Sequence, residues 1–209
     1  VLEMKVLLIN GSPHGAGCTY TALEEVARAL HEDGVETELI QIGTGAVHGC
    51  IGCGHCKSAG CCVFTDDQVN EAAAKLREAD GLVAGSPVYY ASPNGSILAF
   101  LDRLFMSGGG FRLKPAAAIA SARRAGTTAT VDAINKYFSL SGMPIVSSNY
   151  FHVIHGNTPE EAKQDEEGMQ TMRTIGHNMA WLLKCIEAGR GAGVAEPVAE
   201  GKIKTNFIR

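Results

Sequence analysis

Four cysteines with the spacing C-x2-C-x2-C-x5-C lie in one short, glycine-rich segment of the chain. They are Cys50, Cys53, Cys56 and Cys62, and Cys61 adds a thiol that breaks this spacing. A cubane iron-sulfur cluster can take three ligands from a tight C-x2-C-x2-C turn, whereas zinc modules usually separate two C-x2-C pairs by roughly a dozen residues or more. The spacing therefore favours an iron-sulfur cluster over a zinc ion. The alternative is a redox-active pair of neighbouring thiols.

A second segment that could bind a ligand is GSPHGAGCT, at residues 11–19. It lacks the lysine of a P-loop, and it does not match the G-x-G-x-x-G fingerprint of a dinucleotide site. Its glycines and the hydroxyls of Ser12 and Thr19 could instead hold one phosphate group at the N-terminus of a helix. An ordinary turn with Thr19 as the N-cap explains the same residues equally well.

A third segment, SPVYYASPNG at residues 86–95, could form one wall of a binding site. Its two prolines restrict the backbone, and its two tyrosines offer flat faces. Asn94 and Gly95 offer backbone donors beside a helix start. A flat heterocycle with hydrogen-bonding edges fits such a wall. For either tyrosine alone, burial with a satisfied hydroxyl is the simpler explanation.

The elements that must position these segments follow from the apolar pattern, which alternates between strands and helices. The predicted strands are 5–9, 35–42, 81–85, 116–120 and 145–150, and the predicted helices are 21–33, 69–79, 96–105, 131–140 and 158–186. This order indicates an α/β fold with an open, doubly wound parallel sheet, which binds ligands at the carboxyl ends of its strands. We therefore expect functional residues in the loops at 11–19, 44–65, 86–95, 121–128 and 151–158.

Length and composition indicate one domain. The chain has 209 residues, of which 45% are hydrophobic, so residues 1–189 can form a single core, followed by an irregular tail at 190–209. A net charge of −4 without a basic run argues against nucleic acid and anionic membranes as partners. Residues 1–10 do not resemble a signal peptide, and no apolar run approaches the ~20 residues of a membrane span. We expect a cytoplasmic protein without a disulfide framework.

The motifs together resemble a known family. G-S-P-x5-T after the first strand and S-P-V-Y-Y-x-S-P-N-G after the third strand are similar to the flavodoxin-like NAD(P)H-dependent FMN reductase family. The motif C-x2-C-x2-C-x5-C-V-x-x-D-D, together with Gly168-Met169-Gln170-Thr171 in the last helix, resembles its iron-sulfur flavoprotein branch. The resemblance covers residues 5–186 and implies five parallel strands in the order 2-1-3-4-5, with FMN at their carboxyl ends.

The resemblance also implies residues for each cofactor. The FMN phosphate would lie among Ser12, His14, Cys18 and Thr19, and the isoalloxazine ring would contact Pro87, Val88, Tyr89, Tyr90, Asn94 and Gly95. The four spaced cysteines would bind a 4Fe–4S cluster and leave Cys61 free. Segment 121–127 departs from the glycine-rich third loop of many relatives. Here Arg124 could face the pyrimidine edge and stabilise reduced anionic flavin, whereas Arg123 is interpreted as a solvated surface residue.

The function that the resemblance implies is electron transfer through bound FMN. NAD(P)H would act as a transient substrate, a small molecule such as free flavin or a quinone would accept the electrons, and no acid-base residue is required. The alternative is an electron-transfer flavoprotein with cluster and FMN, fed by ferredoxin. A more distant alternative is a metal-binding regulatory module without flavin. Because the cysteine loop follows the second strand, we expect it to lie close to the FMN loops, in the same chain or in a neighbouring copy.

Three remaining predictions concern the last helix and the histidines. An apolar stripe suggests that this helix takes part in a homodimer or homotetramer; the stripe consists of Met169, Met172, Ile175, Met179, Leu182 and Ile186. Cys185 on the same helix is expected to be a packed core thiol. His55, His152 and His155 are interpreted as loop or core residues rather than as ligands or catalysts.

Overall fold

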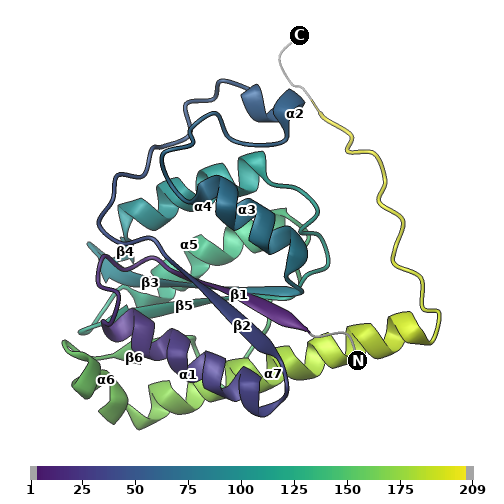
Figure 1. The fold of residues 1–209 in the computed structure, drawn as a ribbon. Coiled ribbons are helices and arrows are strands. Elements are labelled where there is room, and N and C mark those ends of the chain that lie inside the picture. Colours follow the sequence, from purple (N-terminus) through teal and green to yellow (C-terminus); the bar gives the residue numbers. More distant parts are fainter. Residues whose placement is uncertain (1–3, 206–209) are drawn as a thin grey trace.

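A computed structural model describes residues 4–205 and arranges them as a twisted sheet with helices on both faces (Figure 1). The sheet order is β2-β1-β3-β5-β6, all parallel, and short β4 pairs antiparallel with the end of β3. This confirms the predicted doubly wound order. The strands are β1 (Lys5–Asn10), β2 (Glu36–Gln41), β3 (Gly81–Tyr89), β4 (Ser92–Pro93), β5 (Ala116–Ala122) and β6 (Val153–His155). Residues 1–3 and 206–209, the ends of the predicted domain and tail, lie outside the described residues.

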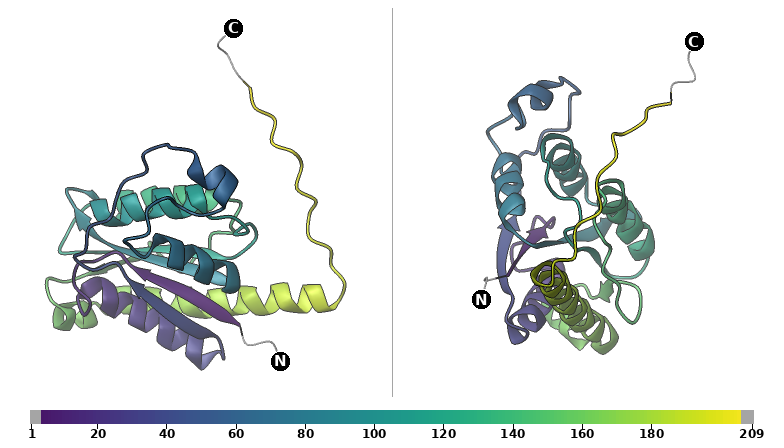
Figure 2. Two further views of the ribbon diagram at one scale, coloured as in Figure 1. Left: turned by 45° about the horizontal axis from the view of Figure 1, so that its top comes forward. Right: turned by 90° about the vertical axis from the view of Figure 1, so that its right-hand side faces the viewer.

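The helices form two layers, one on each face of the sheet (Figure 2). One layer contains α1 (Cys18–Glu32), α6 (Pro159–Gln164) and α7 (Glu166–Gly191). The other contains α3 (Val69–Glu78), α4 (Gly95–Ser107) and α5 (Thr127–Leu140), with short α2 (His55–Ala59) lying over α4. In the part of the chain that the structure describes, no helix is both long and apolar enough to cross a membrane.

The apolar run of β1 shows why this strand must be central. Val6 and Leu8 belong to the core under α1 and α7, whereas Leu7 and Ile9 belong to the core under α3, α4 and α5. Because side chains alternate along a strand, only a strand covered on both faces can bury such an unbroken run. The register between β1 and β3 then brings Asn10 opposite Gly85, so that both strands end at the same edge of the sheet.

The prediction of the fifth strand at 145–150 was wrong. Ile145 makes only an isolated bridge with Ala116, after which the chain leaves the sheet. The hydroxyl of Ser148 then accepts a hydrogen bond from the Tyr150 N–H (3.3 Å) and donates one to the Tyr150 carbonyl (2.7 Å). Serine and asparagine favour such local turns over strands. The strand that completes the sheet is β6, a few residues further on.

Other boundaries also differ from the predictions. α1 begins at Cys18 rather than at residue 21, and α5 begins at Thr127 rather than at 131. Segment 86–95, predicted as a loop, contains the end of β3 and all of β4. The predicted last helix is two helices, because Asp165 ends α6 and caps α7 with a side-chain bond to the Gly168 N–H (2.9 Å).

The apolar stripe of the last helix is used within the chain. Met172, Ile175 and Met179 are fully buried in the core that α7 shares with α1 and the sheet. A Cβ on Gly176 would lie 2.6 Å from the Ala29 Cβ, so the two helices approach closely. Cys185 is exposed, which contradicts the prediction of a core thiol, because at 100° per residue it lies about a third of a turn away from Met179.

Candidate functional site

The largest opening at the carboxyl ends of the strands is a cleft of about 740 Å³. The ends of β3 and β5 and the segments that follow β1, β5 and β6 contribute to it, as expected for a doubly wound sheet. Its volume lies within the range of small-molecule sites. The lining residues are Ser12, Pro13, His14, Gly15, Ala16, Gly17, Cys18, Thr19, Pro87, Val88, Tyr89, Ser121, Ala122, Arg123, Gly156, Asn157, Thr158 and Pro159.

One end of the cleft is the N-terminus of α1. Gly17 is the N-cap and supplies no side-chain hydrogen bond, and the first turn of α1 contains no acidic residue. The first backbone N–H groups of a helix have no partner within the helix and carry partial positive charge. This end of the cleft is therefore suited to an anion such as a phosphate group.

The hydroxyl groups of Ser12 and Thr19, at this end of the cleft, have hydrogen-bond partners within the chain. Ser12 Oγ accepts a hydrogen bond from the His14 N–H (3.1 Å), and the hydroxyls of Thr19 and Ser121 lie 2.7 Å apart. Thr19 lies inside the helix, so the alternative of an ordinary turn with Thr19 as the N-cap was wrong. The hydrogen bond between Thr19 and Ser121 joins the first turn of α1 to the end of β5.

Cys18 also lines this end, as the resemblance implied. Its Sγ donates a weak hydrogen bond to the Gly156 carbonyl (3.5 Å). Burial raises the pKa of the Cys18 thiol above its ordinary value, because a buried thiolate would lose its hydration. The thiol therefore stays neutral at physiological pH and places no negative charge beside the helix N-terminus.

The opposite wall is the hairpin of β3 and β4. Pro87, Val88 and Tyr89 line the cleft, whereas Tyr90 is fully exposed at the tip of the hairpin. Tyr90 and Ala91 both have positive φ (47° and 60°), as a two-residue hairpin turn requires. Gly126 packs against this tip, where a Cβ would lie 2.6 Å from the Ala91 Cα. The structure thus places Tyr89, and not Tyr90, among the residues of the cleft.

Four residues implied by the resemblance lie outside the set that lines the cleft: Tyr90, Asn94, Gly95 and Arg124. The Asn94 N–H, expected to be free, donates to Ser86 Oγ (3.0 Å), and the Asn94 side chain caps α4 by accepting from the Ser96 N–H (2.6 Å). Arg123 is exposed, as interpreted from the sequence, and it lines the open cleft, whereas Arg124 does not. The flavin contacts of these residues stay predictions.

The sequence analysis predicted the loops at 121–128 and 151–158 as functional but did not single out the cleft residues at the end of β5 and after β6. Ser121 and Ala122 end β5, and Gly156 to Pro159 follow β6 directly. The rule that ligands bind at strand ends pointed to these loops, but the misplaced fifth strand obscured their positions. The two histidines near β6 have structural partners, as interpreted: His152 Nδ1 lies 3.0 Å from the Ala118 carbonyl, and His155 Nε2 lies 3.1 Å from the Arg124 carbonyl.

The cysteine loop forms a second cavity, of about 230 Å³. Its lining includes the four cysteines of the spaced motif, Cys50, Cys53, Cys56 and Cys62. Cys61, which breaks the spacing of the motif, does not line it. Residues from the last turns of α4 complete the wall, namely Arg103, Met106 and Ser107. Within residues 4–205, no three histidine, cysteine or acidic side chains are arranged to hold a single metal ion.

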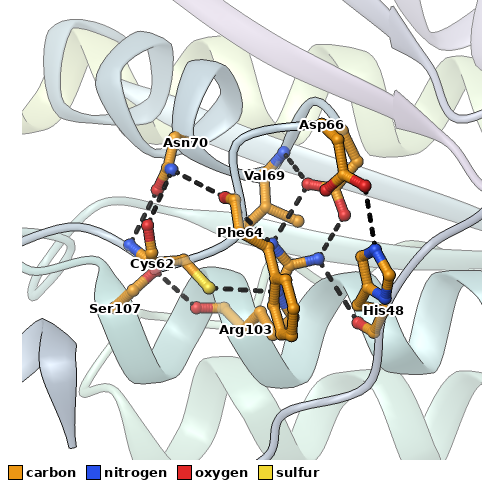
Figure 3. Close-up of polar contacts among 9 residues, drawn as sticks. His48, Cys62, Phe64, Asp66, Val69, Asn70, Arg103 and Ser107 are labelled. Atoms are coloured by element: carbon orange, nitrogen blue, oxygen red, sulfur yellow. Dashed lines mark hydrogen bonds and ion pairs between the residues drawn. The ribbon is translucent and has the colours of Figure 1, made fainter. Parts of the chain in front are cut away.

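A polar network joins the cysteine loop to α3 and α4 (Figure 3). Asn70 holds the backbone of Cys62 on both sides, accepting from its N–H (2.8 Å) and donating to its carbonyl (3.0 Å). Arg103 is buried, forms an ion pair with Asp67, and donates from Nε to Cys62 Sγ at 3.1 Å. Burial disfavours the charged guanidinium, but the bonds to Asp67 and Cys62 outweigh it and raise the pKa of Arg103.

The two sites share no lining residue. The cleft lies at the carboxyl ends of the strands, beside the β3–β4 hairpin that leads into α4, whereas the last turns of α4 line the cysteine cavity. A helix of 13 residues is about 20 Å long, so the two sites lie toward opposite ends of α4. The expected short distance between them, in one chain or between neighbouring copies, stays a prediction.

A parallel sheet in this order, with an anion-accepting helix N-terminus in a cleft at its carboxyl edge, defines the flavodoxin-like class of α/β proteins. The family described as NADPH-dependent FMN reductase matches residues 4–158, so the chain belongs to this family. The resemblance given by the motifs is thereby confirmed. Family membership makes the chain a flavoprotein of the oxidoreductase class.

Sequence relatives are similar over most of the chain. An iron-sulfur flavoprotein of Methanocaldococcus jannaschii is 34% identical over 193 residues, covering 88% of this chain and 100% of the relative. An iron-sulfur flavoprotein of Methanosarcina thermophila is 31% identical over 195 residues, covering 90% of this chain and 99% of the relative.

Solved structures show the same fold at low identity. A flavodoxin from the domain Archaea has a TM-score of 0.60 at 17% identity, covering 87% of this chain and 99% of its own. RosB, solved with 8-demethyl-8-formylriboflavin-5'-phosphate bound, has a TM-score of 0.66 at 16% identity, covering 99% of this chain and 92% of its own.

Proposed function

We propose that this chain is an FMN-dependent NAD(P)H oxidoreductase that also binds a 4Fe–4S cluster. The observation that carries the flavin part is the cleft itself: an uncapped helix N-terminus at one end and a proline-stiffened hairpin at the other. Bound FMN would supply hydride acceptance and electron transfer in steps of one or two electrons. The chain supplies binding, orientation and access.

The residues present fit FMN. The backbone N–H groups of Cys18 and Thr19, with the hydroxyls of Ser12 and Thr19, would hold the phosphate, and the neutral Cys18 thiol adds no repulsion. Tyr89 and Val88 would lie along the flavin ring. Arg123 lines the cleft and would place a positive charge where reduced flavin carries its negative charge. This assigns to Arg123 the role that the sequence had suggested for Arg124.

NAD(P)H would be a transient substrate. The described fold has one cleft at the carboxyl edge of its sheet and adds no second nucleotide-binding unit within residues 4–205. The nicotinamide would therefore approach the open side of the cleft, leave, and be followed by a small acceptor such as free flavin or a quinone. No acid-base residue is required, because hydride passes directly between the two rings.

The donor set of the cysteine cavity fits an iron-sulfur cluster. Four thiols from one motif line a single cavity, and iron-sulfur clusters are held by four cysteine thiolates. A buried guanidinium donates to one of these sulfurs, and this contact stabilises an anionic sulfur more than a neutral thiol. A bound cluster would supply one-electron transfer at a site separate from the cleft.

One observation favours the second candidate, an electron-transfer flavoprotein fed by ferredoxin. The rim of the cysteine cavity exposes Ile51, Val63 and Met106, and a redox protein could dock on such an apolar rim. We also propose assembly as a homodimer or homotetramer, since a second copy could bring its flavin cleft nearer to this cavity than the cleft of the same chain. Nucleic acid and membranes are not proposed as partners.

Anaerobic purification with quantitation of FMN, iron and acid-labile sulfide tests the proposal. We expect one FMN and one cluster per chain, together with NADH or NADPH oxidation by a quinone or free flavin. FMN and activity without iron or sulfide would leave a plain reductase. FMN and cluster without nicotinamide oxidation, but with reduction by a ferredoxin, would support the second candidate.

A further inference from the structure

Arg103 is the one charged residue in the buried face of α4, which is otherwise apolar except for Ser107. Its side chain is 1% exposed, and its neighbours Phe100 and Leu104 belong to the hydrophobic core. Burying a guanidinium is costly unless each of its donors finds a partner. The contacts of Arg103 therefore show what this residue is placed to do.

The guanidinium reaches out of α4 into the cysteine loop (Figure 3). It pairs with Asp67, whose side chain is 6% exposed, and donates to the backbone carbonyls of His48 (3.3 Å) and Phe64 (3.4 Å). The Phe64 ring lies under it, 5.0 Å from the ring centroid to Cζ, and His48 stacks on that ring at 4.3 Å. These contacts fix the guanidinium in one orientation.

In that orientation Nε points to a sulfur atom. The distance from Arg103 Nε to Cys62 Sγ is 3.1 Å, which is short for a bond to sulfur. Asn70 holds the backbone of Cys62 at the same time. Among residues 4–205, Cys62 is the one motif cysteine whose sulfur accepts a side-chain hydrogen bond. Of the other three, Cys50 and Cys53 lie on the loop and Cys56 lies in short α2, in a segment with glycines at positive φ at positions 52, 54 and 60.

We propose that Arg103 is a positioning residue for the cluster ligand Cys62, and that its N–H···S bond raises the reduction potential of the bound cluster. The inference rests on the cluster binding proposed above. Reduction adds negative charge to a cluster, and a charged donor on one of its sulfurs stabilises the more negative state. Because Arg103 and Asn70 hold Cys62, this ligand has a fixed position. The other three cysteines would then close around the cluster.

Two variants separate positioning from folding. Arg103→Lys keeps the charge but lacks the planar fork, so it cannot bind Asp67 and Cys62 together. The double variant Arg103→Met with Asp67→Asn removes both charges and leaves no buried ion unpaired. The matched control is Arg173→Met, which removes an arginine paired with Glu25 (2.8 Å) between α1 and α7, on the other face of the sheet.

The measurements are cluster content, the rate of cluster loss to an iron chelator, the reduction potential, and FMN content as the folding control. We expect both variants to retain FMN, to lose iron about 10-fold to 100-fold faster than the wild type, and to have a more negative cluster potential. The control should match the wild type in all four measurements. If the double variant also loses FMN, it is not correctly folded, and the measurements on Arg103→Lys alone test the inference.

Two results would overturn the inference, and they differ. A wild-type protein that binds FMN without iron or sulfide removes the cluster proposal and this inference with it. A wild-type protein with a cluster, whose potential and loss rate are unchanged in Arg103→Lys, leaves the cluster proposal intact and reduces Arg103 to a structural ion pair.

Discussion

The cleft and the cysteine cavity are built in opposite ways. The cleft takes its residues from the ends of β3 and β5, the start of α1 and the segments after β1, β5 and β6, so the register of the sheet places them, and a hydrogen bond joins the hydroxyl of Thr19 in α1 to that of Ser121 in β5. The cavity takes its four cysteines from thirteen consecutive residues, positions 50–62, and is attached to the domain through side chains of α3 and α4.

Because of this difference, the cleft and the cavity should be sensitive to different kinds of substitution. The cleft depends on close packing of the sheet edge, where a single added methyl group can displace a wall. The cavity depends on a buried ion pair, where loss of one partner leaves an unpaired charge. The two sites share no lining residue, so damage to one should leave the other intact. The following predictions test that independence.

The largest effect is expected from Cys53→Ser. This change should reduce iron and sulfide to background, because a cubane cluster needs its four thiolates, while FMN binding stays at the wild-type level. Cofactor quantitation after anaerobic purification checks both outcomes. Cys61→Ser is the matched control and should retain the cluster, since Cys61 does not line the cavity. Loss of FMN in Cys53→Ser would show that the two sites are not independent.

Asp67→Ala should destabilise the protein by about 3–5 kcal/mol, because it leaves the Arg103 guanidinium buried without its carboxylate. Urea unfolding followed by circular dichroism measures the change. The control is Glu38→Ala, whose carboxylate is 35% exposed and pairs with Lys75 at 3.0 Å, and which should cost less than about 1 kcal/mol. Equal costs for the two variants would contradict a special role for the buried pair.

Gly85→Ala should damage the cleft. The new Cβ would lie 2.9 Å from Thr19 Cγ2 and 3.1 Å from Ile119 Cγ1, so Thr19 must shift. Overpacking of this kind costs about 1–3 kcal/mol of stability, and FMN binding should weaken as well. Gly45→Ala, whose Cβ would have no neighbour within 4 Å and which does not line the cleft, is the control. Thermal unfolding and flavin titration give the two values, and unchanged FMN affinity in Gly85→Ala would place the phosphate elsewhere.

Thr19→Val tests the hydroxyl without disturbing the packing. We expect FMN affinity to fall by about 1–2 kcal/mol, the value of a hydrogen bond to a charged group. Thr21→Val is the control, because its hydroxyl donates to the Gly17 carbonyl (3.2 Å) and does not line the cleft. Fluorescence titration measures both affinities, and equal affinities would mean that the Thr19 hydroxyl serves only its bond to Ser121.

The smallest effect concerns pH and the sheet beneath the cleft. Burial lowers the pKa of His152, and its bond to the Ala118 carbonyl only partly offsets this. The unfolded state therefore binds a proton at higher pH than the folded state, and stability falls as the pH drops below the ordinary value near 6.5. The expected loss between pH 6.5 and 5.5 is at most about 1 kcal/mol, the limit for a single histidine that stays neutral in the folded state. Urea unfolding should show a shallower pH dependence for His152→Gln, and an identical slope would count against a neutral buried His152.

Much of the fold followed from local sequence. The apolar runs at 5–9, 81–85 and 116–120 predicted central strands, because only strands covered on both faces bury every residue. Spacing alone separated the four motif cysteines from Cys61, and the structure keeps that division at the cavity wall. The glycine and hydroxyl pattern of 11–19 likewise predicted a phosphate-sized site at a helix N-terminus.

Other features depended on contacts between distant segments. By local sequence, segment 145–150 is as good a candidate for a strand as 153–155. Only the pairing with β5 shows that the second segment forms the strand. Tyr89 and Tyr90 are indistinguishable by composition, and the hairpin turn points one into the cleft and the other into solvent. The choice of Arg123 over Arg124 at the cleft has the same origin, since adjacent side chains leave the backbone in different directions.

Arg103 shows the limit most clearly. In the sequence, Arg103 is a charged residue among the apolar positions of a predicted helix, and this pattern does not identify its partners. Its partners, Asp67 and Cys62, lie 36 and 41 positions earlier in the chain. Local sequence determines which elements form, because periodicity and propensity act over a few residues. The tertiary structure alone decides which side chains from separate elements meet, because burial couples residues that are far apart in the chain.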